Sequence, residues 1–150
     1  ISLVGLIEKV VSGFELFARA SNVKINFTFE KDLPKVFVDP DQIKQVVENL
    51  LDNAVRYVKE AGQVEISLSK KDKTLYFEIK DNGVGIPKED QKYIFQKFFR
   101  SSNVLRHQTQ GSGLGLYIVK SIVEKAGGKI SFESRENKGS TFWFTLPIKL

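Results

Sequence analysis

Two asparagines, Asn49 and Asn53, stand four residues apart in a segment whose apolar residues recur with helical spacing. Residues four apart share one side of a helix, and each Asn inside a helix costs about 0.5 kcal/mol relative to Ala. Either both side chains are exposed and tolerated, or they form a polar face that accepts from water or binds a hard cation. Mg²⁺ suits the second interpretation because it keeps several waters and needs few protein ligands. Arg56 and Tyr57 follow on the same side, and Arg56 adds a cation for an anion.

A second candidate is the sequence DNGVGI at residues 81–86, which follows a segment that alternates like a strand. Gly83 and Gly85 would allow positive φ angles and the close approach of a flat ligand. Asp81 would then direct its carboxylate into a cavity, where it can accept a hydrogen bond from an exocyclic amine. The alternative interpretation is an ordinary Asn-Gly turn.

A third candidate is the sequence GSGLGL at residues 111–116, which opens a predicted helix. Successive glycines at a helix N-terminus direct free N–H groups, together with the helix dipole, at an anion such as phosphate. A Rossmann fingerprint would need G-x-G-x-x-G directly after a strand. Here the third glycine comes one residue early and a polar loop precedes it, and a Walker A motif is also absent.

The elements that must position these residues are predicted from periodicity and capping. Asp39 is the expected N-cap of the asparagine-bearing helix, with Pro40 at its first position and Gln42 completing a capping box. Helices are predicted over 2–20, 39–58, 88–99 and 113–126, and strands over 23–30, 35–38, 63–69, 74–80, 129–135 and 141–148. Because the later strands come as hairpins, the fold class is α+β: a two-layer sandwich whose mixed, mostly antiparallel sheet carries helices on one face.

Composition limits the function classes. With 150 residues, 41% of them hydrophobic, and a net charge of +5, we expect residues 1–150 to form a single ordered domain. The chain has no cysteine, one histidine and no methionine, so thiolate chemistry is excluded and a piece of a longer protein is expected. No apolar run approaches the roughly 18 residues of a membrane span. The lysines over 70–73 read as a solvated turn, so no nucleic-acid partner is expected.

Taken together and in this order, the motifs resemble those of the catalytic, ATP-binding domain of bacterial sensor histidine kinases, which has the Bergerat (GHKL) fold. The similarity covers essentially the whole chain. The matching segments are the N box at 45–57, the G1 box at 81–85, the F box at 94–100, the G2 box at 111–116 and a terminal hairpin motif, GSTF, at 139–142.

The resemblance implies roles for individual residues. Asp81 would accept from the adenine amino group, in a base pocket lined by Gly83, Gly85 and Ile86. Asn53 would ligate Mg²⁺, and Asn49 would support a phosphate or a metal-bound water. The remaining residues assigned to ATP are Arg56, Tyr57, Arg100, Gly111, Ser112, Gly113, Leu114, Gly115, Leu116 and Thr141. Asn53, Arg56 and Arg100 would act in catalysis, although Arg56 stands where the family usually has Lys, which changes the geometry of a phosphate contact.

The resemblance also implies the function and partners. The domain would bind Mg-ATP and donate the γ-phosphate to a histidine on a separate dimerisation domain, upstream of a response regulator. Residues 1–20 would be the junction helix after that domain, and 100–112 the ATP lid, with His107 a surface residue of the lid. A cytoplasmic location is expected, as the cytoplasmic portion of a membrane-bound sensor without membrane contact of its own. The alternatives are a nucleotide-binding pseudokinase or regulatory module, and a serine-directed kinase of the same fold.

Related ATPases of the superfamily carry a Glu one turn before the Mg-binding Asn, as the base that activates water. Asn49 occupies that position here, and Glu48 points about 100° away on the helix. We therefore expect negligible intrinsic ATP hydrolysis.

Overall fold

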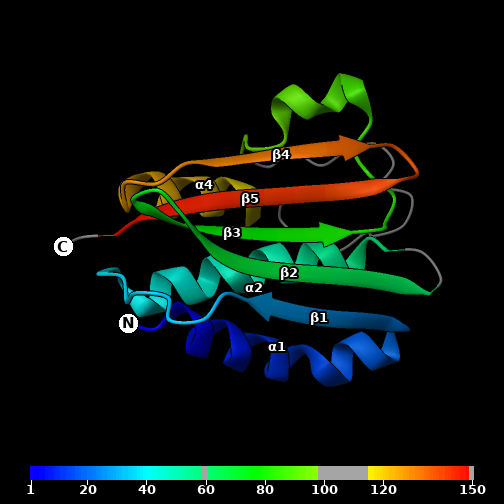
Figure 1. Cartoon of the computed structure of the whole chain (residues 1–150). Coiled ribbons are helices and arrows are strands. Elements are labelled where there is room, and N and C mark those ends of the chain that lie inside the picture. Colours follow the sequence, from blue (N-terminus) through cyan, green and yellow to red (C-terminus); the bar gives the residue numbers. More distant parts are fainter. Residues whose placement is uncertain (59–60, 98–114, 149–150) are drawn as a thin grey trace.

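The computed structural model describes residues 1–58, 61–97 and 115–148. Helices cover one face of a five-stranded sheet in this part of the chain (Figure 1). The elements are α1 (Leu3–Ala20), β1 (Val23–Phe29), α2 (Pro40–Arg56), β2 (Gly62–Lys71), β3 (Thr74–Asp81), the 3₁₀ helix η1 (Lys88–Tyr93), α4 (Gly115–Lys125), β4 (Ile130–Arg135) and β5 (Gly139–Pro147). None of the helices among the described residues is both long enough and apolar enough to span a membrane.

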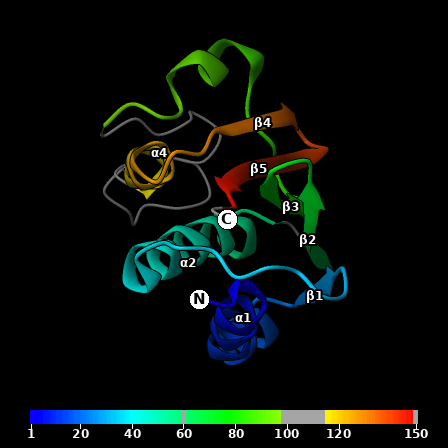
Figure 2. The same ribbon diagram turned by 60° about the vertical axis from the view of Figure 1, so that its left-hand side comes forward.

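The sheet has the strand order β1-β2-β3-β5-β4. β1 and β2 are parallel and are joined through α2, whereas the other three neighbouring pairs are antiparallel. A parallel pair requires a crossover connection, and α2 supplies it. The predicted mixed, mostly antiparallel α+β sandwich is confirmed, and α2 lies between α1 and α4 in the helical layer (Figure 2).

The core lies between the sheet and the helices. β2, β3 and β5 bury alternate residues toward the helical layer, as strands with one covered face do. Phe77 and Phe144 stack at the centre with their ring centroids 4.6 Å apart, and neither is exposed to solvent. Each such buried side chain contributes about 2 kcal/mol of hydrophobic stabilisation, so this face fixes which strand residues point toward the helices.

The start of α2 has the predicted Asp39 cap and the predicted proline at its first position. The Asp39 side chain accepts hydrogen bonds from the backbone N–H groups of Asp41 and Gln42, at 2.9 and 3.3 Å, and Pro40 is the first helical residue. The cap satisfies N–H groups that have no partner within the helix. The helix ends at Arg56 with Tyr57 as C-cap, two residues before the predicted end.

Two predicted elements differ from the structure. The predicted strand over 35–38 is wrong, because this segment is not part of the sheet. Among the described residues its backbone bonds join it to the chain start: Val36 N–H donates to the Ile1 carbonyl and Ile1 N donates to the Val36 carbonyl. Its apolar alternation reflects burial of the Val36 side chain rather than membership of the sheet. Within the predicted helix over 88–99, residues 88–93 form the 3₁₀ helix η1, residues 94–97 form turns, and 98–99 lie outside the described residues.

Candidate functional site

The asparagine side of α2 faces the start of α4. Asn49 Nδ2 donates to the backbone carbonyl of Gly115, over 3.4 Å, and Gly115 is the first residue of α4. Asn53 lies one turn further along α2 and is half-buried. The structure therefore brings two predicted motifs together, since Gly115 belongs to the glycine-rich sequence at 111–116. Leu116, from the same sequence, packs against the core.

The C-terminal end of α2 is tied to the loop after β3. The N–H of Val84 donates to the carbonyl of Tyr57 over 2.9 Å. A Cβ atom on Gly83 would overlap the same carbonyl oxygen, so only glycine allows the loop to approach the helix this closely. Gly83 does not have the predicted positive φ angle; its requirement for glycine comes from the neighbouring backbone.

The same loop is also held by the β4–β5 turn. Gly85 has the predicted positive φ, +68°, and a Cβ atom there would overlap the carbonyl of Arg135. The N–H of Asn137 donates to the Val84 carbonyl over 2.6 Å. The absence of a side chain at Gly83 and at Gly85 thus makes room for the backbone of Tyr57 and of Arg135. These close approaches fix the position of the loop against α2 and the hairpin.

Asp81 is the last residue of β3 and continues the alternation of Leu75, Phe77 and Ile79 toward the helical layer. Its Oδ1 accepts from the N–H of Gly83 over 2.8 Å, and the backbone N–H of Ser140 also donates to the carboxylate. Burial raises the pKa of Asp81 to about 6, against the lowering effect of those two bonds. A half-buried carboxylate with unused acceptor capacity can bind a further donor, such as a ligand amine.

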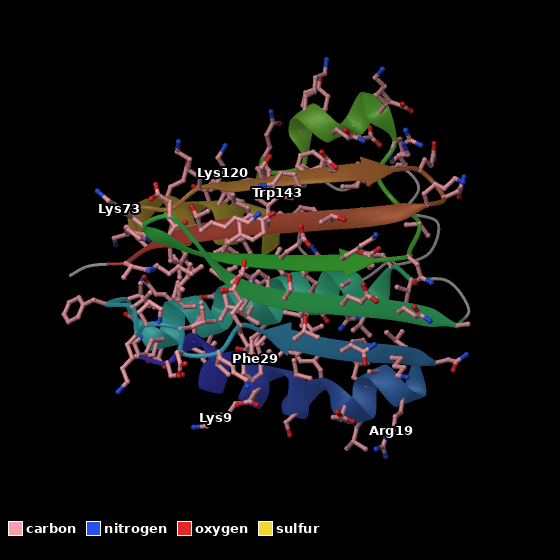
Figure 3. The ribbon with its side chains drawn as sticks, in the orientation of Figure 1. Lys9, Arg19, Phe29, Lys73, Lys120 and Trp143 are labelled. Atoms are coloured by element: carbon pink, nitrogen blue, oxygen red, sulfur yellow. The ribbon has the colours of Figure 1, made fainter. Side chains whose placement is uncertain are left out.

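Ser140 lies in the predicted hairpin motif GSTF at 139–142, in which only Thr141 was predicted to have a role. It pairs with Asp81 in the β3–β5 register, is 8% exposed, and its Oγ lies 2.7 Å from Ser134 Oγ. Thr141, the predicted residue, pairs with Lys80 on the other face of the sheet and is not brought together with Asp81. Figure 3 shows Trp143, two residues further along β5, on the face turned away from α2 and α4. The alternation of Phe142, Phe144 and Leu146 was the available signal, since it places Ser140 on the apolar side.

Ile86 and η1 complete the frame around the loop. The N–H of Ile86 donates to Ser134 Oγ over 2.8 Å. Gln91 Nε2 donates to the carbonyls of Ile86 and Ser134, at 3.1 and 3.0 Å. The end of the loop after β3 is therefore held by the side chains of Ser134 and Gln91, whereas its middle is held by the backbone bonds of Val84 to Tyr57 and Asn137.

Arg56 points away from the asparagines. Its Nε donates to both carboxylate oxygens of Asp52, at 2.8 and 2.9 Å, and its guanidinium carbon lies 5.1 Å from the ring centroid of Phe17 in α1. The structure thus places Arg56 on the α1 side of α2, whereas Asn49 contacts α4 on the other side (Figure 2).

Several predicted site residues lie outside the described residues. They are Arg100, Gly111, Ser112, Gly113 and Leu114, with the rest of the predicted lid at 100–112. In the ranges 1–58, 61–97 and 115–148, no three or more acidic or histidine side chains gather into a metal site. A metal in the described part of the site would therefore rely on the Asn53 carboxamide and on oxygens of a ligand.

Comparison with known proteins identifies the family. Residues 38–150 match the family model described as histidine kinase-, DNA gyrase B-, and HSP90-like ATPase. The sensor histidine kinase WalK of Bacillus subtilis is 36% identical over 151 residues, which cover 99% of this chain and 24% of WalK. The chain therefore spans about a quarter of the length of that relative.

Solved structures agree with this assignment. The catalytic domain of histidine kinase ThkA has a TM-score of 0.84 and 35% identity, over 98% of this chain and 93% of that one. ThkA in complex with the response regulator TrrA has a TM-score of 0.80 and 32% identity, over 99% of this chain and 41% of that one. The chain thus belongs to the histidine kinase-, DNA gyrase B-, and HSP90-like ATPase family, as an ATP-binding catalytic domain of the sensor histidine kinase type.

Proposed function

We propose that this domain binds Mg-ATP and donates the γ-phosphate to a histidine on a separate dimerisation domain of a two-component sensor kinase. The observation that carries the proposal is the Asp81 carboxylate, which is directed into the layer between sheet and helices and held by Gly83 and Ser140. An acceptor in this environment suits the adenine amino group, a donor that guanine lacks at the same position.

The phosphate end of the nucleotide would lie along the asparagine side of α2, toward the start of α4. Helix N-termini favour phosphate, and α4 begins at Gly115 beside Asn49. The side chain of Asn53 makes no hydrogen bond to another described residue, so its oxygen is available to Mg²⁺. The bound ion would neutralise charge on the phosphates. Asn53 would hold that ion, and Arg56 and Arg100 would contact the phosphates.

The phosphoacceptor is expected on another domain. Phosphoryl transfer depends on alignment and charge neutralisation, and the single histidine, His107, falls in the predicted lid rather than on a dimerisation helix. The ThkA complex with TrrA supports a response regulator as the downstream partner. α1, within the predicted junction 1–20, would connect to the dimerisation domain, on the cytoplasmic side of a membrane-bound sensor.

The test combines this chain with a purified dimerisation domain that carries the phosphoacceptor histidine, labelled ATP and Mg²⁺. We expect label on the histidine, and no label when that histidine is replaced by Gln. Nucleotide binding without transfer to any acceptor would favour a regulatory pseudokinase, and label on a serine would favour a serine-directed kinase. A steady hydrolysis rate near one per second in the isolated domain would contradict the absence of a water-activating base.

A further inference from the structure

The guanidinium of Arg56 is bound on two sides by groups that are not part of the proposed nucleotide site. Asp52, one turn earlier on α2, accepts from Nε with both carboxylate oxygens. Phe17 of α1 presents its ring face 5.1 Å from the guanidinium carbon. Arg56 and Asp52 keep about a third of their side-chain surface exposed, 34% and 38%, so both groups can rearrange without unfolding the core.

The angular positions of these residues around α2 show which way the Arg56 side chain turns. At about 100° per residue, Asp52 is turned about 100° from Asn53 around the helix axis. Arg56 comes three residues after Asn53, a rotation of about 300°, which places it about 60° from Asn53 on the same side as Asp52. The Arg56 side chain can therefore extend in either of two directions: toward Asp52 and α1, or toward Asn53 and α4. The structure shows the first, because the Arg56 guanidinium contacts Asp52 and Phe17.

We propose that Asp52 and Phe17 are positioning residues that hold Arg56 in a resting place away from the phosphates, and that a bound triphosphate must compete for it. This inference rests on the proposed function, since it requires a phosphate contact for Arg56. A triphosphate carries more negative charge than one carboxylate, so it can attract the guanidinium away from Asp52 and toward the asparagine side of α2. Asp52 and Phe17 then lower the affinity for the triphosphate and leave the affinity for an uncharged nucleoside unchanged.

The expected size of the effect follows from the exposure of the contacts. An exposed ion pair contributes about 0.2–1 kcal/mol, which corresponds to a change in affinity of up to about fivefold. An exposed cation–π contact has a similar magnitude. Removal of either partner should therefore tighten ATP binding by roughly twofold to fivefold.

The experiment measures ATP and adenosine affinities by calorimetry for the 150-residue chain and its variants. We expect Asp52→Asn and Phe17→Leu each to tighten ATP binding and to leave adenosine binding unchanged. Asp52→Glu keeps a carboxylate one turn before Arg56 and can form the same ion pair, so its ATP affinity should equal that of the parent. In an Arg56→Ala background, which itself weakens ATP binding, Asp52→Asn and Phe17→Leu should have no further effect.

Two matched variants separate this mechanism from general effects. Glu48→Gln removes another carboxylate from α2, and Phe14→Leu removes the neighbouring aromatic ring of α1, whose centroid lies 6.2 Å from that of Phe17; both should leave ATP affinity at the parent value. Unchanged or weaker ATP binding by Asp52→Asn overturns the inference. So does tighter binding that persists without Arg56, or an Arg56→Ala variant that binds ATP as the parent does. If the parent binds neither ATP nor adenosine, the proposed function fails, and the inference with it.

Discussion

Asp81 and Ser140 are paired across β3 and β5, and the backbone N–H of Ser140 donates to the Asp81 carboxylate. The bond joins the end of the glycine loop to the terminal hairpin, two segments nearly 60 residues apart in the chain. It orients the one carboxylate on which the proposed recognition of adenine depends, because a strand pair allows little lateral movement.

Asp81→Asn should abolish binding of adenine nucleotides and leave the fold intact. The carboxamide still accepts from Gly83 and Ser140 through its oxygen, but its amide group then faces the adenine amino group, donor against donor. Calorimetry with ATP measures the binding, and thermal unfolding at pH 7 checks that the midpoint does not fall. Unchanged affinity in a folded variant would refute the assignment of Asp81 to adenine.

Stability should depend on pH through Asp81. Its folded pKa of about 6 lies above the ordinary 3.8, so between these values the folded state binds more protons than the unfolded state. The free energy of unfolding of the parent, relative to Asp81→Asn, should therefore fall as pH rises from about 4 through 6 and become level at about pH 7. Denaturant unfolding of both chains at each pH measures the difference. A difference that rises with pH would contradict the raised pKa.

The same ionisation should control adenosine binding by the parent. Below pH 6 the carboxyl becomes protonated, and a carboxylic acid is the weaker acceptor for the adenine amino group. We expect adenosine affinity to fall between pH 7 and pH 5. Adenosine is the appropriate probe because it has no phosphate to titrate in that range. Equal adenosine affinity at pH 7 and pH 5 would show that the Asp81 carboxylate does not bind the adenine base.

Ser140→Ala and Thr141→Ala should have different effects although the residues are adjacent. Ser140→Ala removes the buried contact between the hydroxyls of Ser140 and Ser134, 2.7 Å apart, and should lower the free energy of unfolding by about 1 kcal/mol. It should also weaken adenosine binding, because the Ser134 hydroxyl that loses this contact also accepts from the N–H of Ile86 in the loop after β3. Thr141, on the opposite face of the sheet, should tolerate Ala within about 0.5 kcal/mol and bind adenosine as the parent does. Denaturant unfolding measures the free energy of unfolding, and calorimetry measures the adenosine affinity. A larger loss of adenosine affinity for Thr141→Ala than for Ser140→Ala would assign Thr141, and not Ser140, to the binding site.

Gly85→Ala and Gly13→Ala should change stability in opposite directions. An alanine at position 85 meets both the positive φ of +68° and the Arg135 carbonyl, and should lower the free energy of unfolding by about 1–3 kcal/mol. Gly13 lies within α1, and among the described residues an added Cβ would meet no atom within 4 Å outside the adjacent residues and the backbone of its own helix. Alanine at position 13 should therefore raise the free energy of unfolding by about 0.5–1 kcal/mol. Urea unfolding of both variants provides the comparison. Equal stability of Gly85→Ala and the parent would show that the loop can move away from the hairpin.

Local sequence patterns were sufficient for much of the fold. Asp39 and Pro40 predicted where α2 begins, because a cap depends on residues adjacent in the chain. The alternating residues of β2 and β3 predicted a hairpin, because side chains along a strand face opposite sides in turn. The segment at 35–38 shows the limit: burial of Val36 produces the same alternation without a strand partner.

The candidate site was predictable in its residue types but not in all its contacts. The spacing of Asn49 and Asn53 placed both on one side of a helix, since the helical repeat is local. Which neighbour that side faces depended on the packing of α4, and the requirement for glycine at position 83 depended on the approach of the Tyr57 carbonyl. The side chain of Arg56 turned toward α1 because Asp52 and Phe17 lie within its reach. Periodicity reports the direction in which a residue leaves its own element, and only the packed chain decides which partner it meets there.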